Sequence, residues 1–175
     1  MMAMTKYFRY VLRHKWFVFI ECCKLGVPWL GIIHDWSKFL PSEFIPYARH
    51  FYGKGRGVDS GHGSTGYYKP VNTGDPAFDW AWFLHQKRNK HHWQWWCKTP
   101  VAVPSVNDIP STAIGAGAFD MPIRYRKEML ADWRGAGRAL GTPDTAAWYR
   151  AHEKDMVLGM RTRIWMFQKL VLGDK

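Results

Sequence analysis

The sequence predicts an all-α protein, and three of its features support that prediction. Apolar residues recur at helical spacing along most of the chain, and no alternating strand pattern exceeds four residues. Pro and Gly residues stand where helices would begin and end. A hydrophobic fraction of 47% with 11 Trp residues excludes a disordered chain. We therefore expect one domain over residues 1–175, a bundle of five to seven helices with two long loops, about 53–75 and 98–121.

Three helices are predicted before the first loop. One covers about 5–25 and stops at Gly26, and His14 lies on its apolar, inward-facing stripe. A second helix, about 28–39, and a third, about 41–52, each begin at a proline, whose fixed φ suits the first helical turn.

Four helices are predicted after the first loop. A long aromatic helix is expected over about 76–97, followed by helices over about 122–140 and 155–172. Between the last two, Asp144 is placed to cap a short helix that ends near Glu153.

The first loop is rich in glycine but lacks the GxxxxGK[ST] order of a phosphate-binding P-loop. It is either a plain surface loop or a basic lid in which Lys54, Arg56 or His62 meets phosphate.

Charge and cysteine content restrict the partners and the compartment. Lys and Arg number 25 against 14 acidic residues, a formal charge of +11. Such a balance either favours a polyanionic partner or serves solubility. Three cysteines form no disulfide framework, and no secretory signal or apolar run of about 20 residues is present. We expect a cytoplasmic protein of a bacterium or a phage-infected cell, with no membrane partner.

The adjacent pair His34-Asp35 is the strongest functional signal. Imidazole nitrogen suits transition metals, and a carboxylate can bridge two ions. Lys38 follows three residues after Asp35, so on a helix it reaches the same pocket and could clamp a phosphate.

Further candidate ligands lie on other predicted helices. His85, Asn89 and His92 share one face of the helix over 76–97, with Arg88 and His91 on a neighbouring face. These histidines either bind metal or pack as ordinary core residues. Glu128 and Asp132 are i, i+4 neighbours on one helix face. Asp132 could be a metal ligand, or the two residues could belong to a surface salt-bridge ladder. Helical bundles build metal sites from side chains on facing helices, and here four helices offer ligands.

The order H…HD…D resembles the HD superfamily of metal-dependent phosphohydrolases, in which a His, a His-Asp pair and a distant Asp hold the metal. The resemblance assigns these roles to His14, His34, Asp35 and Asp132, with His85 and His91 or His92 as the extra ligands of dinuclear members. The short gap between His14 and His34 leaves open a first ligand from the segment 85–92 instead.

Four sequence blocks also resemble a family of uncharacterised bacterial and phage proteins, domain of unknown function 5662. They are RHKWFVFIECCKLG, HDWSKFLPSEFIPYARHFYG, HQKRNKHHWQWW and YRKEMLADWRGAGRA. The family name implies no activity, so this resemblance supports the fold more than the function.

The sequence thus predicts an HD-like bundle that holds one or two divalent ions of Mn, Fe, Ni or Zn and hydrolyses a phosphate ester. Lys38, Arg88 and Arg124 would stabilise phosphate charge, Asp35 would bridge the ions or orient the nucleophile, and Asn89, Trp36 or Trp96 would contact substrate. The expected substrate is a nucleotide or a cyclic (oligo)nucleotide, such as a host defence signal. The alternatives are a non-catalytic binder of an anionic nucleotide or nucleic acid, and an interaction inhibitor whose metal is structural.

Overall fold

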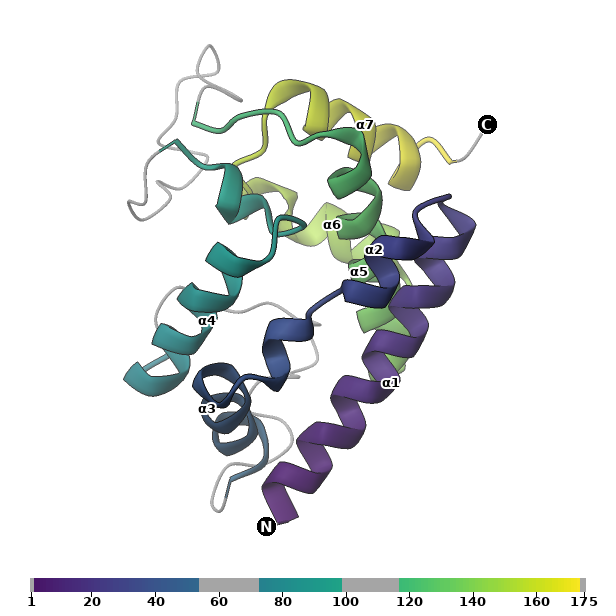
Figure 1. Ribbon diagram of the computed structural model, residues 1–175. Helices are drawn as coiled ribbons and strands as arrows, with labels where there is room; N and C mark the ends of the chain where they lie inside the picture. Colours follow the sequence, from purple (N-terminus) through teal and green to yellow (C-terminus); the bar gives the residue numbers. More distant parts are fainter. Residues whose placement is uncertain (1, 54–72, 99–116, 174–175) are drawn as a thin grey trace.

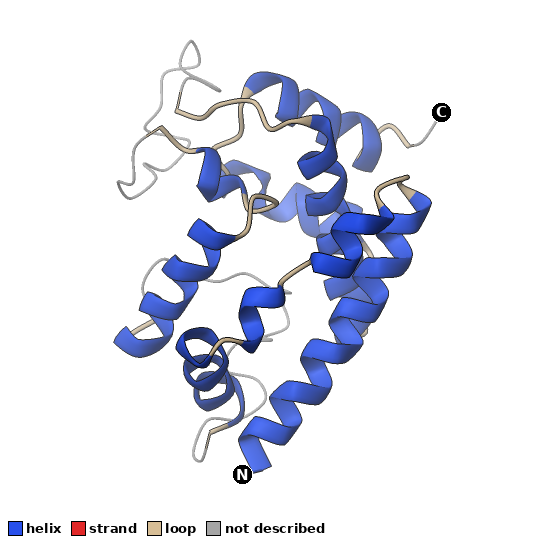
Figure 2. Cartoon of the chain, viewed as in Figure 1, coloured by secondary structure: helices blue, strands red, loops and turns tan. Residues whose placement is uncertain are grey.

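The computed structural model describes residues 2–53, 73–98 and 117–173, and within these ranges the protein is all-helical, as the sequence predicts (Figures 1 and 2). Its only β feature there is an isolated antiparallel bridge between Cys97 and Ala118. The described α-helices are α1 (Met2–Lys24), α2 (Pro28–Ile33), α3 (Pro41–Tyr52), α4 (Pro76–Arg88), α5 (Ile123–Leu140), α6 (Thr145–His152) and α7 (Met160–Leu170). Three short 3₁₀ turns accompany them: η1 (Trp36–Phe39), η3 (Trp93–Trp96) and η6 (Glu153–Asp155).

The long helix α1 organises the fold, because it packs against α2, α3 and α5. It lies close to α5 at Gly135, where an added Cβ would lie 2.8 Å from the backbone nitrogen of Val18. Only a glycine permits this contact. The contact sets the register of the two helices one turn away, where His14 of α1 faces Asp132 of α5.

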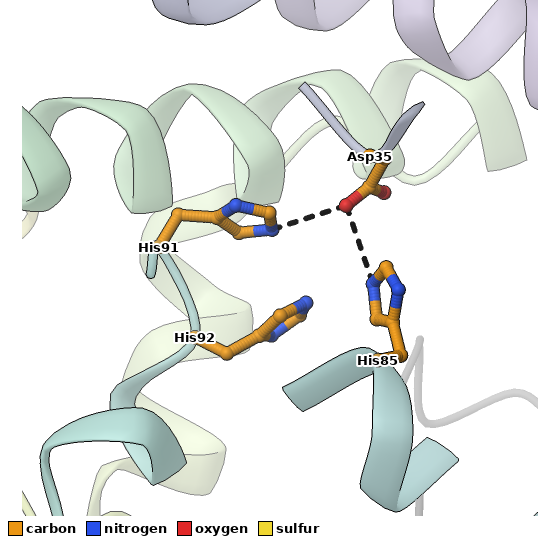
Figure 3. A group of neighbouring side chains, drawn as sticks. All are labelled: Asp35, His85, His91 and His92. Atoms are coloured by element: carbon orange, nitrogen blue, oxygen red, sulfur yellow. Dashed lines mark ion pairs between the residues drawn. The ribbon is translucent and has the colours of Figure 1, made fainter. Parts of the chain in front are cut away.

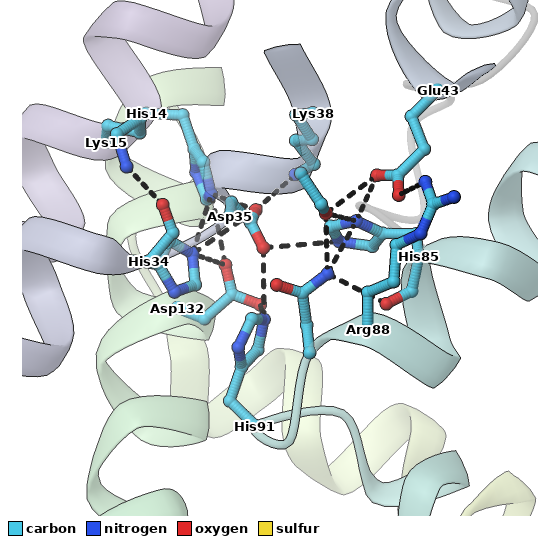
Figure 4. A network of polar contacts seen from close by, with 12 residues as sticks. His14, Lys15, His34, Asp35, Lys38, Glu43, His85, Arg88, His91 and Asp132 are labelled. Atoms are coloured by element: carbon cyan, nitrogen blue, oxygen red, sulfur yellow. Dashed lines mark hydrogen bonds and ion pairs between the residues drawn. The ribbon is translucent and has the colours of Figure 1, made fainter. Parts of the chain in front are cut away.

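Two apolar clusters stabilise the two ends of the molecule. One joins α1, α3 and α4 around Tyr7, Tyr47 and Phe78, and the other joins α5, α6 and α7 around Met129 and Tyr149. Both contain large side chains that are almost fully buried. A group of buried histidines and carboxylates lies where α1, α4 and α5 meet (Figure 4).

The helix predicted over 28–39 is interrupted at the His-Asp pair. Helix α2 ends at Ile33, His34 is extended, and Asp35 adopts a left-handed conformation with φ 52° and ψ 24°. Such a backbone costs about 1–3 kcal/mol for a residue other than glycine and persists where the surroundings impose it. Here it turns the Asp35 carboxylate into the protein.

The helix predicted over 76–97 was also too long, since α4 ends at Arg88. Asn89 stops it, because its side-chain Nδ2 donates to the carbonyl of His85 at 2.8 Å and the backbone turns extended. His91 and His92 therefore follow the helix on a turn and do not lie on its face.

Smaller differences concern other ends. Helix α1 already includes Met2, and α7 begins at Met160 rather than near 155, because η6 and an extended stretch precede it. Asp144 caps α6 as predicted, accepting from the backbone of Ala147 at 2.8 Å. The middle of both predicted loops, 54–72 with Lys54, Arg56 and His62, and 99–116, lies outside the described residues.

Among the described residues, no helix has the length and apolar content to cross a bilayer. Cys22 is buried, Cys97 is half-buried and Cys23 is exposed, and none of the three forms a disulfide with a described residue.

Candidate metal centre

Four segments of the chain bring the predicted ligands into one cluster. Helix α1 supplies His14, the turn between α2 and η1 supplies His34 and Asp35, and α5 supplies Asp132 (Figure 4). His85 comes from the last turn of α4, and His91 and His92 follow that helix. All seven predicted metal ligands thus meet, although ligation itself stays a prediction.

The first group comprises His14, His34, Asp35 and Asp132, whose ligand atoms lie within 4.8 Å of one another. His14 Nε2 is 3.1 Å from Asp132 Oδ1 and 3.5 Å from Asp35 Oδ2. His34 Nε2 is 3.3 Å from Asp35 Oδ2, 3.4 Å from Asp132 Oδ1 and 3.4 Å from His14 Nε2.

The second group comprises Asp35, His85, His91 and His92, also within 4.8 Å of one another (Figure 3). Here the other oxygen of Asp35 is used: Oδ1 is 3.2 Å from His85 Nε2 and 3.3 Å from His91 Nε2. Asp132 Oδ2 lies 3.9 Å from His91 Nε2, at the edge of this group. Asp35 therefore presents one oxygen to each group, which is the arrangement of a carboxylate that bridges two ions.

The spacing of the first group fits an ion. The five measured separations fall between 3.1 and 3.5 Å. A tetrahedron of ligands with metal–ligand bonds of about 2.0–2.1 Å has edges of about 3.3–3.4 Å, and cis ligands of an octahedron lie about 3.0 Å apart. The four atoms are thus spaced to hold one divalent transition metal.

Unsatisfied buried atoms support the same reading for the second group. Asp35 Oδ1 and the Nε2 atoms of His85, His91 and His92 are buried and make no well-aligned hydrogen bond to any described residue, although Oδ1 lies within ion-pair distance of the Nε2 atoms of His85 and His91. A buried polar atom without a good hydrogen bond costs free energy, and four such atoms converge here. A cation at their centre would satisfy all four.

Glu128 connects the two groups from behind. Its Oε1 accepts from His34 Nδ1 at 3.1 Å and from His91 Nδ1 at 3.2 Å. With the proton on Nδ1, each imidazole directs the lone pair of Nε2 toward the cluster, as metal-binding histidines require. The alternative of a surface salt-bridge ladder formed by Glu128 and Asp132 is wrong, because both side chains are buried.

Glu43 plays the corresponding part for His85, although its sequence position did not mark it as a site residue. Glu43 Oε2 accepts from His85 Nδ1 at 2.8 Å and from Ser37 Oγ at 2.9 Å. Arg88 donates to Glu43 Oε1 at 2.7 Å, and Asn89 Nδ2 donates to Ser37 Oγ at 2.9 Å. Arg88 and Asn89 thus support His85. A sequence signal did exist, since Glu43 and Ser37 flank the His-Asp segment, but nothing in their spacing distinguished them from helix-end residues.

The electrostatics favour a cation. Burial alone would raise the pKa values of Asp35 and Asp132. The neighbouring histidines, together with Lys38 in the case of Asp35, outweigh burial and hold both pKa values well below the ordinary value. Burial likewise acts against Glu128, but His91 and His34 lower its pKa to about 2. Three ionised carboxylates then face one buried ammonium, Lys38, which leaves two excess negative charges for histidine protons or metal to balance.

The histidines differ from one another in basicity. Burial opposes protonation of His34, but the carboxylates of Asp35, Asp132 and Glu128 prevail and raise its pKa well above the usual value. Burial and the nearby charges of His91 and His85 lower the pKa of His92 well below it. Metal binding would therefore displace a proton from His34 and find His92 already neutral.

Two lysines border the cluster. Lys38 Nζ is 2.5 Å from Asp35 Oδ2 and the side chain is buried, so its first partner is the carboxylate. The charge of Asp35 raises the pKa of Lys38 against the effect of burial. Lys15 donates to the backbone carbonyl of His34, which fixes the turn that carries the His-Asp pair (Figure 4).

Three predicted site residues lie outside the cluster. Arg124 is exposed, with its guanidinium 4.9 Å from the ring centre of Tyr125. Trp36 is 61% exposed, although it follows the buried His-Asp pair directly. Trp96 is half-buried against the α5–α7 core and donates to the carbonyl of Lys90. Their roles toward a substrate stay predictions.

The described fold and cluster define an all-helical protein with buried histidine and carboxylate groups whose geometry is compatible with metal binding. The chain belongs to the family of unknown function DUF5662, whose sequence profile matches residues 3–170. This match confirms the resemblance noted from the four sequence blocks. No curated protein and no solved structure matches the chain, and the relationship to the HD superfamily stays a prediction.

Proposed function

We propose that this protein is a metal-dependent phosphohydrolase or phosphodiesterase of HD-like type that acts on a nucleotide or a cyclic (oligo)nucleotide. One observation supports the proposal most: two groups of ligand atoms share Asp35, one through each oxygen. Bridged pairs of divalent ions are a common solution for phosphate ester hydrolysis. A host defence signal in the cytoplasm of a bacterium or a phage-infected cell is the substrate that this proposal favours.

The chain's own residues would divide the work as follows. The first and second groups would each hold one divalent ion of Mn, Fe, Ni or Zn. Ions bound there would supply Lewis acidity, which acidifies a water molecule and neutralises charge on a phosphoryl group. Glu128 and Glu43 would orient the imidazoles, and Lys38 would keep Asp35 ionised while placing an ammonium next to the phosphate.

A second candidate is a non-catalytic binder of an anionic nucleotide. The observation that favours it is the burial of the cluster, in which His14, His34, Asp35, His85 and His91 are each at most 2% exposed. A metal held this deeply also suits a structural role. In that case the formal charge of +11 would attract the ligand to another surface.

Metal analysis combined with a substrate panel separates these functions. We expect purified protein to contain, or to acquire, up to two divalent ions per chain and to cleave at least one phosphodiester among nucleotides and cyclic dinucleotides. His34→Ala and Asp35→Ala should lose both metal and activity, whereas His152→Ala on α6, which contacts Trp148 instead, should keep both. Tight binding of a nucleotide that is released intact with every metal would favour the binder.

A further inference from the structure

The outer surface formed by α1, α2 and η1 is unusually apolar. Helix α1 exposes Phe8, Leu12 and Trp16 at four-residue spacing, with exposed fractions of 44%, 48% and 61%. Beside them, α2 exposes Trp29 at 66% and Ile32 at 55%. Scattered apolar residues on a surface need no explanation, but a gathering of large aromatic and aliphatic side chains marks an interaction site.

We call these residues, together with Phe39 at the end of η1, the aromatic face. The rings of Phe8 on α1 and Phe39 at the end of η1 have centroids 6.2 Å apart. Farther along, the backbone of α2 at Gly31 packs so closely on Phe19 that an added Cβ would lie 2.9 Å from its Cα. Figure 1 shows α2 lying beside the C-terminal half of α1.

The exposed charge of the same segment is entirely positive. Residues 2–53 contain three acidic side chains, Glu21, Asp35 and Glu43, and all three are buried. The exposed charged residues of this segment are Lys6, Arg9, Arg13, Lys24 and Arg49. On α1, the cations at 9 and 13 directly follow the exposed apolar residues at 8 and 12, so a basic stripe runs beside the apolar one.

We propose that the aromatic face and its basic stripe bind the surface of a membrane that contains anionic phospholipid. Trp and Phe partition into the headgroup region, and Lys and Arg beside them add attraction to anionic lipid. Two positively charged copies of the face would repel each other, which disfavours self-association. Leu12 and Ile32 offer no stacking surface for nucleobases, which disfavours a nucleic acid. The protein would lie on the membrane without crossing it, which departs from the sequence-based expectation of no membrane partner. This inference does not rest on the proposed enzymatic function.

Vesicle co-sedimentation of the full chain tests the proposal. We expect binding to vesicles of phosphatidylcholine with 30% phosphatidylglycerol, much weaker binding to pure phosphatidylcholine, and weakening by salt (about 30% anionic lipid gives a negative surface potential). Arg9→Glu/Arg13→Glu should reduce the partition coefficient at least tenfold, because each basic residue near an anionic surface contributes roughly a fivefold gain. Arg150→Glu/Lys154→Glu, the same change of charge at exposed positions near α6, is the matched control and should have a smaller effect.

A second pair of variants tests the apolar contribution. Trp16→Ala should reduce binding, whereas Trp80→Ala on α4 should not, although both side chains are 61% exposed in the wild type. Unchanged circular dichroism would verify folding of each variant. The proposal is overturned by equal binding to both vesicle types, by no binding at all, or by equal effects of test and control variants. A dimer in light scattering that Trp16→Ala dissociates would also overturn it, as would oligonucleotide binding that replaces vesicle binding.

Discussion

Glu128 offers the sharpest test of how the cluster is organised, because one oxygen of its carboxylate holds a histidine of each group. Replacing it by Gln keeps the size of the side chain and removes the charge. The lowering of its pKa from 4.5 to about 2 means that the ionised form is favoured by about 3 kcal/mol in the metal-free cluster. Loss of such an outer partner reduces metal affinity by about 10–100-fold.

Since His34 and His91 both accept support from Glu128, we expect Glu128→Gln to reduce the affinity for both ions by about 10–100-fold. The control is Glu43→Gln. Among the cluster histidines Glu43 holds only His85, so this variant should reduce only the affinity for the ion of the second group. Competition titration against a chelator, with metal content of the dialysed protein, measures the two affinities. The reasoning would be refuted if Glu128→Gln left both affinities unchanged, or if the two variants gave the same pattern.

Three further predictions concern single side chains. Lys38→Met should destabilise the metal-free protein by about 3 kcal/mol, because it strands the buried Asp35 carboxylate, and added metal should recover most of the loss in thermal melting; unchanged melting with lost activity would instead identify Lys38 as a phosphate clamp. Glu128 has a depressed folded-state pKa, so its contribution to the stability of metal-free protein, at most about 3 kcal/mol, should be complete above pH 4.5 and disappear as the pH falls toward 2. Urea unfolding of wild type and Glu128→Gln between pH 6 and 3 would show the difference in their free energies of unfolding shrinking as the pH falls. A difference that stays constant over this range would contradict the prediction. Arg88→Ala should reduce the affinity for the ion of the second group, because Arg88 holds Glu43. Arg124→Ala should leave metal content and melting temperature unchanged. Equal loss of metal in both variants would be inconsistent with these contacts.

The fold class and the ligand set were accessible from the sequence because both depend on residue types with strong preferences. Prolines at 28 and 41 and the glycine at 26 mark helix ends by backbone geometry alone, and the structure has helix ends there. The His-Asp pair stood out because its two side chains are both metal ligands.

The parts that could not be predicted depend on tertiary contacts. Asn89 ends α4 by a side-chain hydrogen bond, without the Gly or Pro that would announce it, so helical spacing wrongly placed His92 on one face with His85. The left-handed backbone of Asp35 has no sequence signal either, because the surrounding packing imposes it. Glu43 and Glu128 resemble surface residues until the histidines that they hold are known.

The central claim is that the cluster holds two divalent ions bridged by Asp35, and crystallography with anomalous scattering tests it most directly. Crystals grown or soaked with Mn²⁺ should show two anomalous peaks about 3.5–4 Å apart. One should contact His14, His34, Asp35 Oδ2 and Asp132, and the other Asp35 Oδ1 with His85, His91 and His92. No peak at the cluster, or peaks that Asp35 does not bridge, would contradict the account.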